Sequence, residues 1–214
     1  MIYAENVLIC IAAPLVLLSF FTKGETKRFA LTFVAGMCVC LISAYISGFL
    51  NMVFDQEVSY TSVYTAPVVE EAMKMVPVVL YMVLLRPADS SLRNFGLAIG
   101  AGFATYENCC YLLNVGTESL TFILVRGFAA GIMHIVSISA LVFGLTISRR
   151  FHILSSGSVV GAAALAMIFH GIYNLLVSKP GVSQVIGYAL PLAALIVMYY
   201  PYTRFFDEFS DQNL

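Results

Sequence analysis

The sequence contains few charged residues and lacks the motifs of several common classes of protein. Only 11% of its 214 residues are charged, against about 25% in a typical soluble domain, and this excludes a soluble globular fold. The net charge of −1 and the absence of a basic tail give no indication of a nucleic-acid partner. No GxSxG or HExxH motif occurs. The cysteines lie in apolar stretches without CxxC spacing, and we expect them to be packing residues: Cys10, Cys38, Cys40, Cys109 and Cys110.

Long apolar runs make up most of the chain. Hydrophobic residues account for 60% of the sequence, and the mean hydropathy is +0.91. A transmembrane helix needs about 20 mostly apolar residues, and seven stretches qualify. The connections between them are short, without internal repeats. We therefore predict an all-α polytopic membrane bundle, one integral membrane domain over residues 1–214, with spans at approximately 2–21, 29–54, 63–85, 94–115, 120–147, 157–177 and 184–202.

The basic residues of the loops fix the orientation that we expect. The connections after the first, third, fifth and seventh spans carry Lys23, Lys27, Arg28, Arg86, Arg93, Arg149, Arg150 and Arg204. The opposite connections, "DQEVSYTS", "GTES" and "SKPGVS", carry only Lys179. Cytoplasmic loops are enriched in lysine and arginine, so the N-terminus is predicted outside and the C-terminus in the cytoplasm.

Ionisable and polar side chains also lie inside the predicted spans, where each ionisable group costs on the order of 2–3 kcal/mol. They are Glu70, Glu71, Lys74, Glu107, Arg126, His134, His170 and Asn174. Glu70, Glu107 and His170 belong to three different spans, and each lies about 10–12 Å below the external end of its span. We therefore predict that they converge on one site within the motif-bearing core, residues 63–177.

These side chains suit the activation of water. Three glutamates against Lys74 and Arg126 leave an excess of negative charge, so we expect one glutamate to be protonated or one histidine to be cationic. A carboxyl group beside a histidine can act as a general acid and base on water. An Asn–His pair one helical turn apart, such as His170 and Asn174, can donate hydrogen bonds to an oxyanion. Hydrolysis of a peptide or an ester fits this set.

Two other functions remain open on the same residues. A zinc-dependent membrane metalloprotease would use the metal ligands Glu71, Glu107, His134 and His170, because zinc prefers imidazole and carboxylate groups. A proton-coupled membrane transporter is the second alternative, since buried glutamate and lysine also mark proton relays.

Four short motifs occur in order in consecutive spans. They are "EEAMK" at Glu70–Lys74, "FATYE" at Phe103–Glu107, a lone His134, and "HGIYN" at His170–Asn174. Together they resemble the motifs of the PrsW family of intramembrane proteases, which is related to the CAAX-type membrane proteases. The resemblance covers the third to the sixth span.

The resemblance implies a peptidase in which a glutamate activates water, and we favour a glutamic-type enzyme without a metal cofactor over the zinc-dependent alternative. In it Glu70 would be the general base and Glu71 its partner. His170 and Asn174 would stabilise the oxyanion, and His134 would orient groups or shuttle protons. Lys74 would be a counter-charge and Phe103 would shape the pocket. Glu107 stands where the CAAX-type proteases usually have a histidine.

The resemblance also implies a substrate and a location. PrsW-type proteases cut a single-span anti-sigma factor near its extracytoplasmic side, in the cytoplasmic membrane of prokaryotes. We therefore expect a membrane-anchored protein substrate and the lipid bilayer as partners. The predicted external depth of the site agrees with such a cut, and it disfavours a prenylated CAAX substrate approached from the cytoplasm.

Overall fold

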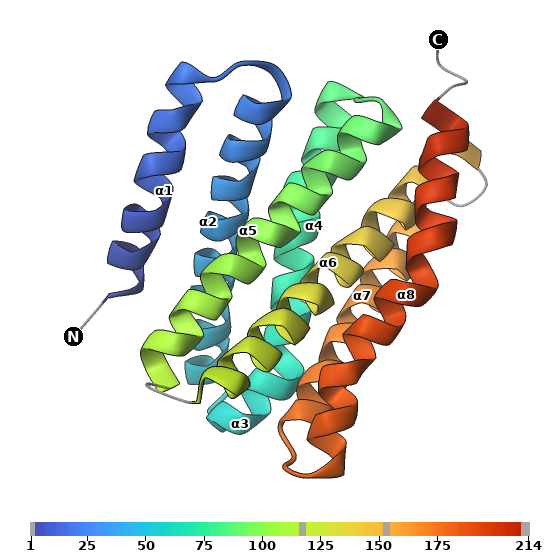
Figure 1. Cartoon of the computed structure of the whole chain (residues 1–214). Coiled ribbons are helices and arrows are strands. Elements are labelled where there is room, and N and C mark those ends of the chain that lie inside the picture. The colour runs from blue at the N-terminus through green and yellow to red at the C-terminus, as the bar shows by residue number, and fades with distance from the viewer. Residues whose placement is uncertain (1–2, 116–118, 152–154, 211–214) are drawn as a thin grey trace.

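The computed structural model describes residues 3–115, 119–151 and 155–210, which form an entirely helical bundle without strands over these ranges. Seven long helices run side by side (Figure 1). A short helix and a π-helical turn precede one of them. The elements are α1 (Ala4–Phe21), α2 (Gly24–Val53), α3 (Val58–Tyr60), η1 (Thr61–Thr65), α4 (Ala66–Leu85), α5 (Asp89–Val115), α6 (Leu120–Phe151), α7 (Ser155–Val177) and α8 (Val182–Ser210).

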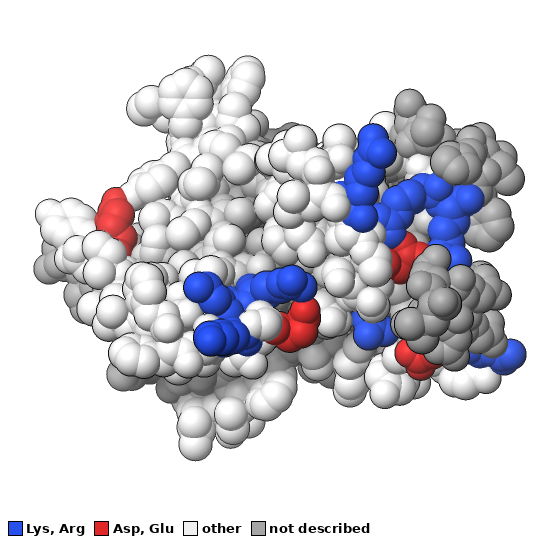
Figure 2. Space-filling view, turned by 90° about the horizontal axis from the view of Figure 1, so that it is seen from above, with Lys and Arg blue, Asp and Glu red and all other residues white. Residues whose placement is uncertain are grey.

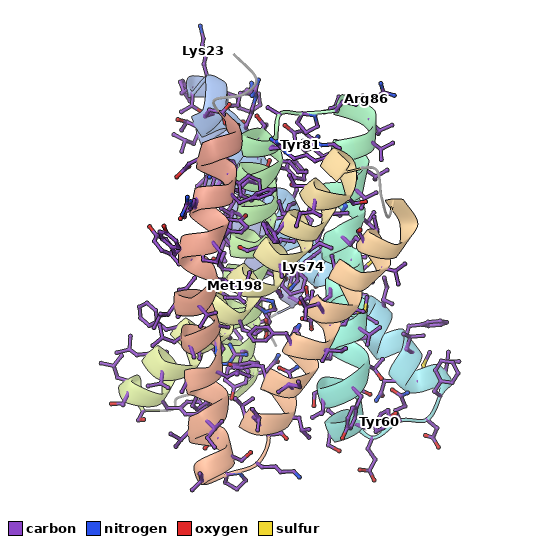
Figure 3. The ribbon with its side chains drawn as sticks, turned by 90° about the vertical axis from the view of Figure 1, so that its right-hand side faces the viewer. Lys23, Tyr60, Lys74, Tyr81, Arg86 and Met198 are labelled. Atoms are coloured by element: carbon purple, nitrogen blue, oxygen red, sulfur yellow. The ribbon has the colours of Figure 1, made fainter. Side chains whose placement is uncertain are left out.

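Successive long helices run in opposite directions, so the connections alternate between two ends of the bundle. Lys23 and Arg86 lie at one end and Tyr60 at the other (Figure 3). We call the first the basic end, and Figure 2 looks onto it and shows the lysine and arginine side chains gathered there. The two ends of the bundle thus differ in charge as the loop sequences predict.

Within the described ranges, five helices are long and apolar enough to cross a membrane: α1, α2, α6, α7 and α8. The remaining long helices, α4 and α5, carry the glutamates and Lys74, which lower their hydropathy. Both run alongside the other five, α5 against α2 and α6, and α4 against α2 and α7 (Figure 1). The prediction of an all-α polytopic membrane bundle is confirmed.

Glycines allow α5 to approach its neighbours closely. A Cβ atom at Gly102 would overlap the backbone carbonyl of Phe33 in α2, and one at Gly36 in α2 would overlap the carbonyl of Ile99. On another face of α5, Gly96 and Gly100 lie against Val142 and Ile138 of α6. Small residues of this kind let membrane helices pack backbone to backbone, and here they hold α5 between α2 and α6.

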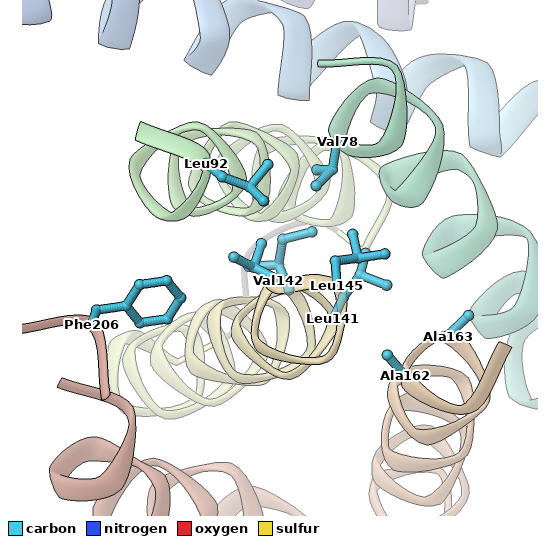
Figure 4. Packing of buried hydrophobic residues seen from close by; sticks show 9 residues of the cluster. Val78, Leu92, Leu141, Val142, Leu145, Ala162, Ala163 and Phe206 are labelled. Atoms are coloured by element: carbon cyan, nitrogen blue, oxygen red, sulfur yellow. The ribbon is translucent and has the colours of Figure 1, made fainter. Parts of the chain in front are cut away.

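Nine buried hydrophobic residues from several helices pack against one another (Figure 4). We call these buried residues the apolar cluster: Val78, Leu92, Ile138, Leu141, Val142, Leu145, Ala162, Ala163 and Phe206. They come from α4, α5, α6, α7 and α8. The cluster therefore joins α8 to the four helices that carry the polar side chains further along.

One predicted connection is wrong. The stretch "DQEVSYTS" was expected to be a loop, but helical structure begins at Val58 and continues through η1 into α4. The polar side chains satisfy one another locally: Asn51 Nδ2 donates to the carbonyl of Gln56 at 2.7 Å and to Thr61 Oγ1 at 2.6 Å. Thr65 Oγ1 donates to Gln56 Oε1 at 2.8 Å. Hydropathy marks only the apolar part of a helix, and for the same reason α2, α5 and α8 extend beyond their predicted spans.

Candidate active site

Seven side chains from four helices meet inside the bundle. We call them the polar cluster: Glu70, Glu71 and Lys74 of α4, Glu107 of α5, His134 and Ser137 of α6, and His170 of α7. Lys74 lies near mid-height between the two ends (Figure 3). The structure thus brings together the acids and histidines that the sequence placed on separate spans.

Glu71 is the centre of the cluster. Its Oε1 atom accepts hydrogen bonds from Lys74 Nζ at 2.6 Å and from Ser137 Oγ at 3.2 Å, and it lies 2.8 Å from His170 Nδ1. The side chain is only 1% exposed. Removing a buried carboxylate from water is costly unless it is paired and hydrogen-bonded, and Oε1 has three partners whereas Oε2 is buried without one. Glu71 is therefore held rigidly and in turn orients His170.

Lys74 connects Glu71 to His134. Its Nζ atom lies 2.7 Å from His134 Nδ1 and 4.4 Å from the centre of the Phe103 ring. An ammonium group only donates, so His134 Nδ1 accepts this bond and the ring hydrogen is on Nε2. His134 Nε2 then donates to Glu107, which it contacts directly. Phe103 is fully buried and covers both Lys74 and His134, as expected of a residue that shapes the pocket.

Glu107 is held from its other side by Arg126 of α6. Arg126 Nη2 lies 3.1 Å from Glu107 Oε1, and its guanidinium also donates to Asn108 Oδ1. The guanidinium carbon is 3.6 Å from the centre of the Tyr111 ring, which places the cation over the aromatic face. Asn108 Nδ2 donates to the carbonyl of Gly127 at 3.1 Å. These contacts fix Arg126 beside the carboxylate.

A cavity of about 330 Å³ leads from the polar cluster toward the end opposite the basic end. Glu70, Glu107 and Arg126 line its inner part, and its wall includes Asn174, Tyr111, Tyr173 and Tyr188. Glu70 Oε2 is buried without a hydrogen-bond partner and lies 3.7 Å from His170 Nε2. Of the two acids at the cavity, Glu107 is fully engaged by His134 and Arg126, whereas Glu70 keeps an oxygen free for a ligand.

Two residues are placed differently from the sequence-based picture. Lys74, expected as a counter-charge, pairs with Glu71 and also bonds His134 of α6. Asn174, expected to act with His170, lines the cavity and donates through Nδ2 to the carbonyl of Ser62 in η1 at 2.9 Å. An amide NH₂ group has two hydrogens, so one remains available after this bond.

Sequence reasoning missed several members of the site. Ser137 is one serine among apolar residues of α6, and nothing in its spacing marks it. Asn108 and Tyr111 follow the Glu107 motif, and their contacts with Arg126 depend on how α5 packs on α6. The only sequence signal for these two was Arg126, a cation within a span that needed partners.

The site also offers a set of metal ligands. One ligand atom each from Glu70, His134 and His170 lies within 4.8 Å of the other two. Imidazole and carboxylate are zinc ligands, and a histidine that ligates zinc commonly donates its other ring nitrogen to a carboxylate, as His170 can to Glu71. The unpaired Glu70 Oε2 also fits a ligand role. To bind a metal, His134 would have to give up its hydrogen bond with either Lys74 or Glu107. The carboxylate in this group is that of Glu70, whereas the sequence named Glu71 and Glu107 beside the two histidines.

A helical membrane bundle that encloses acids and histidines beside a polar cavity has the parts of a membrane-embedded hydrolase. The model of the PrsW family, described as intramembrane metalloproteases, matches residues 25–203. The chain belongs to this family and is a multi-pass membrane peptidase, and the resemblance seen in its motifs is confirmed. The match begins in α2, so α1 precedes it. No curated protein and no solved structure gives a match.

Proposed function

We propose that the protein is an intramembrane endopeptidase in which Glu70 activates the attacking water. The observation that carries this proposal is the position of Glu70, which lines the cavity and has a buried Oε2 atom without a hydrogen-bond partner. A general base must lie within hydrogen-bond reach of the water that it deprotonates, and an unpaired oxygen at a cavity meets this condition. Glu71 also has a buried Oε2 atom without a partner, but Glu71 does not line the cavity, and its Oε1 atom holds His170.

In the proposed reaction Glu70 takes a proton from water as the oxygen attacks the scissile carbonyl. A C–O bond forms, and the carbonyl oxygen becomes an oxyanion. The second amide hydrogen of Asn174, and His170 when it is protonated, are donors for this oxyanion. Glu70 then gives its proton to the leaving amine as the C–N bond breaks. The hydrogen bonds that His134 makes with Glu107 and Lys74 hold its ring in one orientation. The centre of this ring lies 5.0 Å from the centre of the His170 ring.

The proposed substrate is a single-span membrane protein, such as an anti-sigma factor, cut near its extracytoplasmic side. The cavity supports this proposal because its wall is built from the ends of helices that lie away from the basic end: Ser62, Tyr111, Phe122, Val177 and Gln184. The positive-inside rule assigns the basic end to the cytoplasm. We accordingly propose the cytoplasmic membrane of a prokaryote as the location, with the N-terminus outside.

A zinc-dependent peptidase at the same site is the second candidate. The convergence of Glu70, His134 and His170 favours it, together with the bond from His170 to Glu71. When bound, zinc would lower the pKa of its water and polarise the scissile carbonyl. Glu70 would then hold the metal, while Glu71 would still orient His170.

The test of Glu70 uses purified full-length protein in lipid and a single-span reporter with a cleavage site beside the membrane. Glu70→Gln keeps the size of the side chain and removes the base, so cleavage is expected to fall at least ~1,000-fold with unchanged thermal unfolding. Glu57→Gln is the matched control, because Glu57 is an exposed acid just before α3. Cleavage by Glu70→Gln at more than a tenth of the unmodified rate would remove Glu70 as the base.

Metal analysis separates the two candidates. The glutamate mechanism predicts less than 0.1 zinc per chain after purification without chelators, and full activity after dialysis against a chelator. Stoichiometric zinc that is lost in His170→Ala, with activity restored by added zinc in the unmodified protein, would replace the glutamate mechanism with the metal mechanism.

A further inference from the structure

A second cavity lies at the basic end, on the far side of the apolar cluster from the active site. Its volume is about 810 Å³, and it is formed by the last turn of α4, the 86–88 connection, the end of α6 and the beginning of α7. None of the polar cluster lines it. The cavity is therefore separate from the active site.

Three arginines and one acid line this cavity. Arg149 Nη1 donates to the carbonyl of Pro87 at 2.7 Å, and the same guanidinium pairs with Asp89. Arg150 Nε donates to the other carboxylate oxygen of Asp89 at 2.6 Å. Asp89 is the one acid among the described residues that line the cavity, so this lining carries more basic than acidic groups. We call the contacts of Arg149 and Arg150 with Asp89 the Asp89 clamp. The clamp holds the two guanidinium groups at the end of α6, where they can bind a ligand.

Arg86 supplies the third cation from a different position. It ends α4 in the left-handed backbone conformation, with φ of 44°, and its side chain is exposed at the rim of the cavity. It has no part in the Asp89 clamp among the described contacts. Arg86 can therefore turn toward a bound anion without breaking any contact that holds the helices together.

The wall below the arginines is apolar. Met82 and Val83 of α4 and Val159 of α7 line the cavity, and Val83 is 58% exposed. A small oxyanion would contact only the arginines and would leave the apolar wall uncovered. A lipid that carries both a phosphate and an acyl chain would contact the arginines and the apolar wall together. Basic pockets between membrane helices at the cytoplasmic side suit anionic headgroups.

We propose that this cavity is a binding site for an anionic phospholipid, with the phosphate among Arg86, Arg149 and Arg150 and an acyl chain along Met82, Val83 and Val159. The fork of N–H donors on each guanidinium matches phosphate oxygens. The apolar wall distinguishes the lipid from free phosphate, which shares the headgroup chemistry. The site does not depend on the proposed reaction.

The experiment counts lipids bound to the full-length protein by native mass spectrometry, with phosphatidylglycerol and phosphatidylcholine of identical acyl chains. Phosphatidylglycerol is expected to bind at a discrete site at least tenfold more tightly than phosphatidylcholine. Arg86→Gln should weaken it about fivefold, which corresponds to about 1 kcal/mol at 1.4 kcal/mol per tenfold. Lys27→Gln is the matched control, because it removes an equal, exposed charge at the start of α2, outside the cavity.

Each alternative outcome overturns the proposal. Equal weakening by Arg86→Gln and Lys27→Gln would mean diffuse attraction to the basic end. Equal binding of the two lipids would mean an apolar groove without headgroup recognition. Displacement of phosphatidylglycerol by inorganic phosphate at an equal concentration would mean that the site takes the free ion. Because no readout uses proteolysis, failure of the proposed peptidase mechanism leaves these results unaffected.

Discussion

The polar cluster and the apolar cluster share the helices α4, α5, α6 and α7 but are held together differently. In α4, Glu70 and Lys74 belong to the polar cluster, and Val78, one turn further on, is fully buried in the apolar cluster. In α6, His134 and Ser137 are followed directly by Ile138. The change from polar to apolar interior therefore occurs within a single turn of each helix.

This contrast shows which forces act within a bilayer. Lipid tails are as apolar as leucine, so the apolar cluster gains close packing rather than removal from water. The polar cluster is stabilised by directional bonds whose loss leaves a charge unpaired in a medium of low dielectric constant. We expect the two clusters to differ in how stability and activity respond to substitution.

The largest expected effect is that of Lys74→Met, which leaves Glu71 without its cation. The free energy of unfolding should fall by about 3–5 kcal/mol, as when one partner of a buried ion pair is removed. Denaturant titration in mixed micelles measures it, with Lys27→Met as the control because Lys27 is exposed. A loss below 1 kcal/mol would show that Glu71 carries no charge in the folded protein.

A smaller loss is expected from Leu141→Ala in the apolar cluster. Leu141 is 1% exposed, so the substitution opens a cavity, which should cost about 2 kcal/mol of unfolding free energy. Cleavage of the reporter per folded molecule should stay within twofold. Leu84→Ala, at a position that is 72% exposed, is the control for leucine removal. Lost activity in a folded Leu141→Ala protein would mean that the two clusters act as one unit.

The smallest effect concerns Arg126, at the edge of the polar cluster. Arg126→Gln frees Glu107 from one of its partners, and we expect reporter cleavage to fall about tenfold, or about 1.4 kcal/mol in activation free energy, as when a partner that orients an active-site group is removed. Arg93→Gln is the matched control, because Arg93 makes an ion pair with Asp207 outside the site. Unchanged cleavage would show that His134 alone holds Glu107.

Much of the fold could be predicted because membrane helices are encoded locally. Apolar length gives the spans, and the alternation of loop charge gives the two different ends. Local sequence could not predict that Val58–Thr65 is helical. The polar residues of this segment are stabilised by Asn51 at the end of α2 and by Gln56 in the connection before α3.

The sequence predicts which residues form the site better than it predicts which of these residues contact one another. Depth along each helix places Glu70, Glu107 and His170 at one level, since helical rise is constant. Which carboxylate meets which histidine depends on the rotation of each helix about its axis. That rotation is set by close packing at positions such as Gly36 and Gly102, which periodicity alone does not determine.

The spread of partners around Glu71 has a consequence for how the protein is made. Lys74 follows it by three residues, but Ser137 follows by 66 and His170 by 99. During synthesis α4 therefore leaves the ribosome long before α6 and α7 exist to complete the coordination of its carboxylate. Until α6 and α7 are inserted, the carboxylate of Glu71 lacks two of its three partners. The active site of this protein can therefore form only after α6 and α7 have been made.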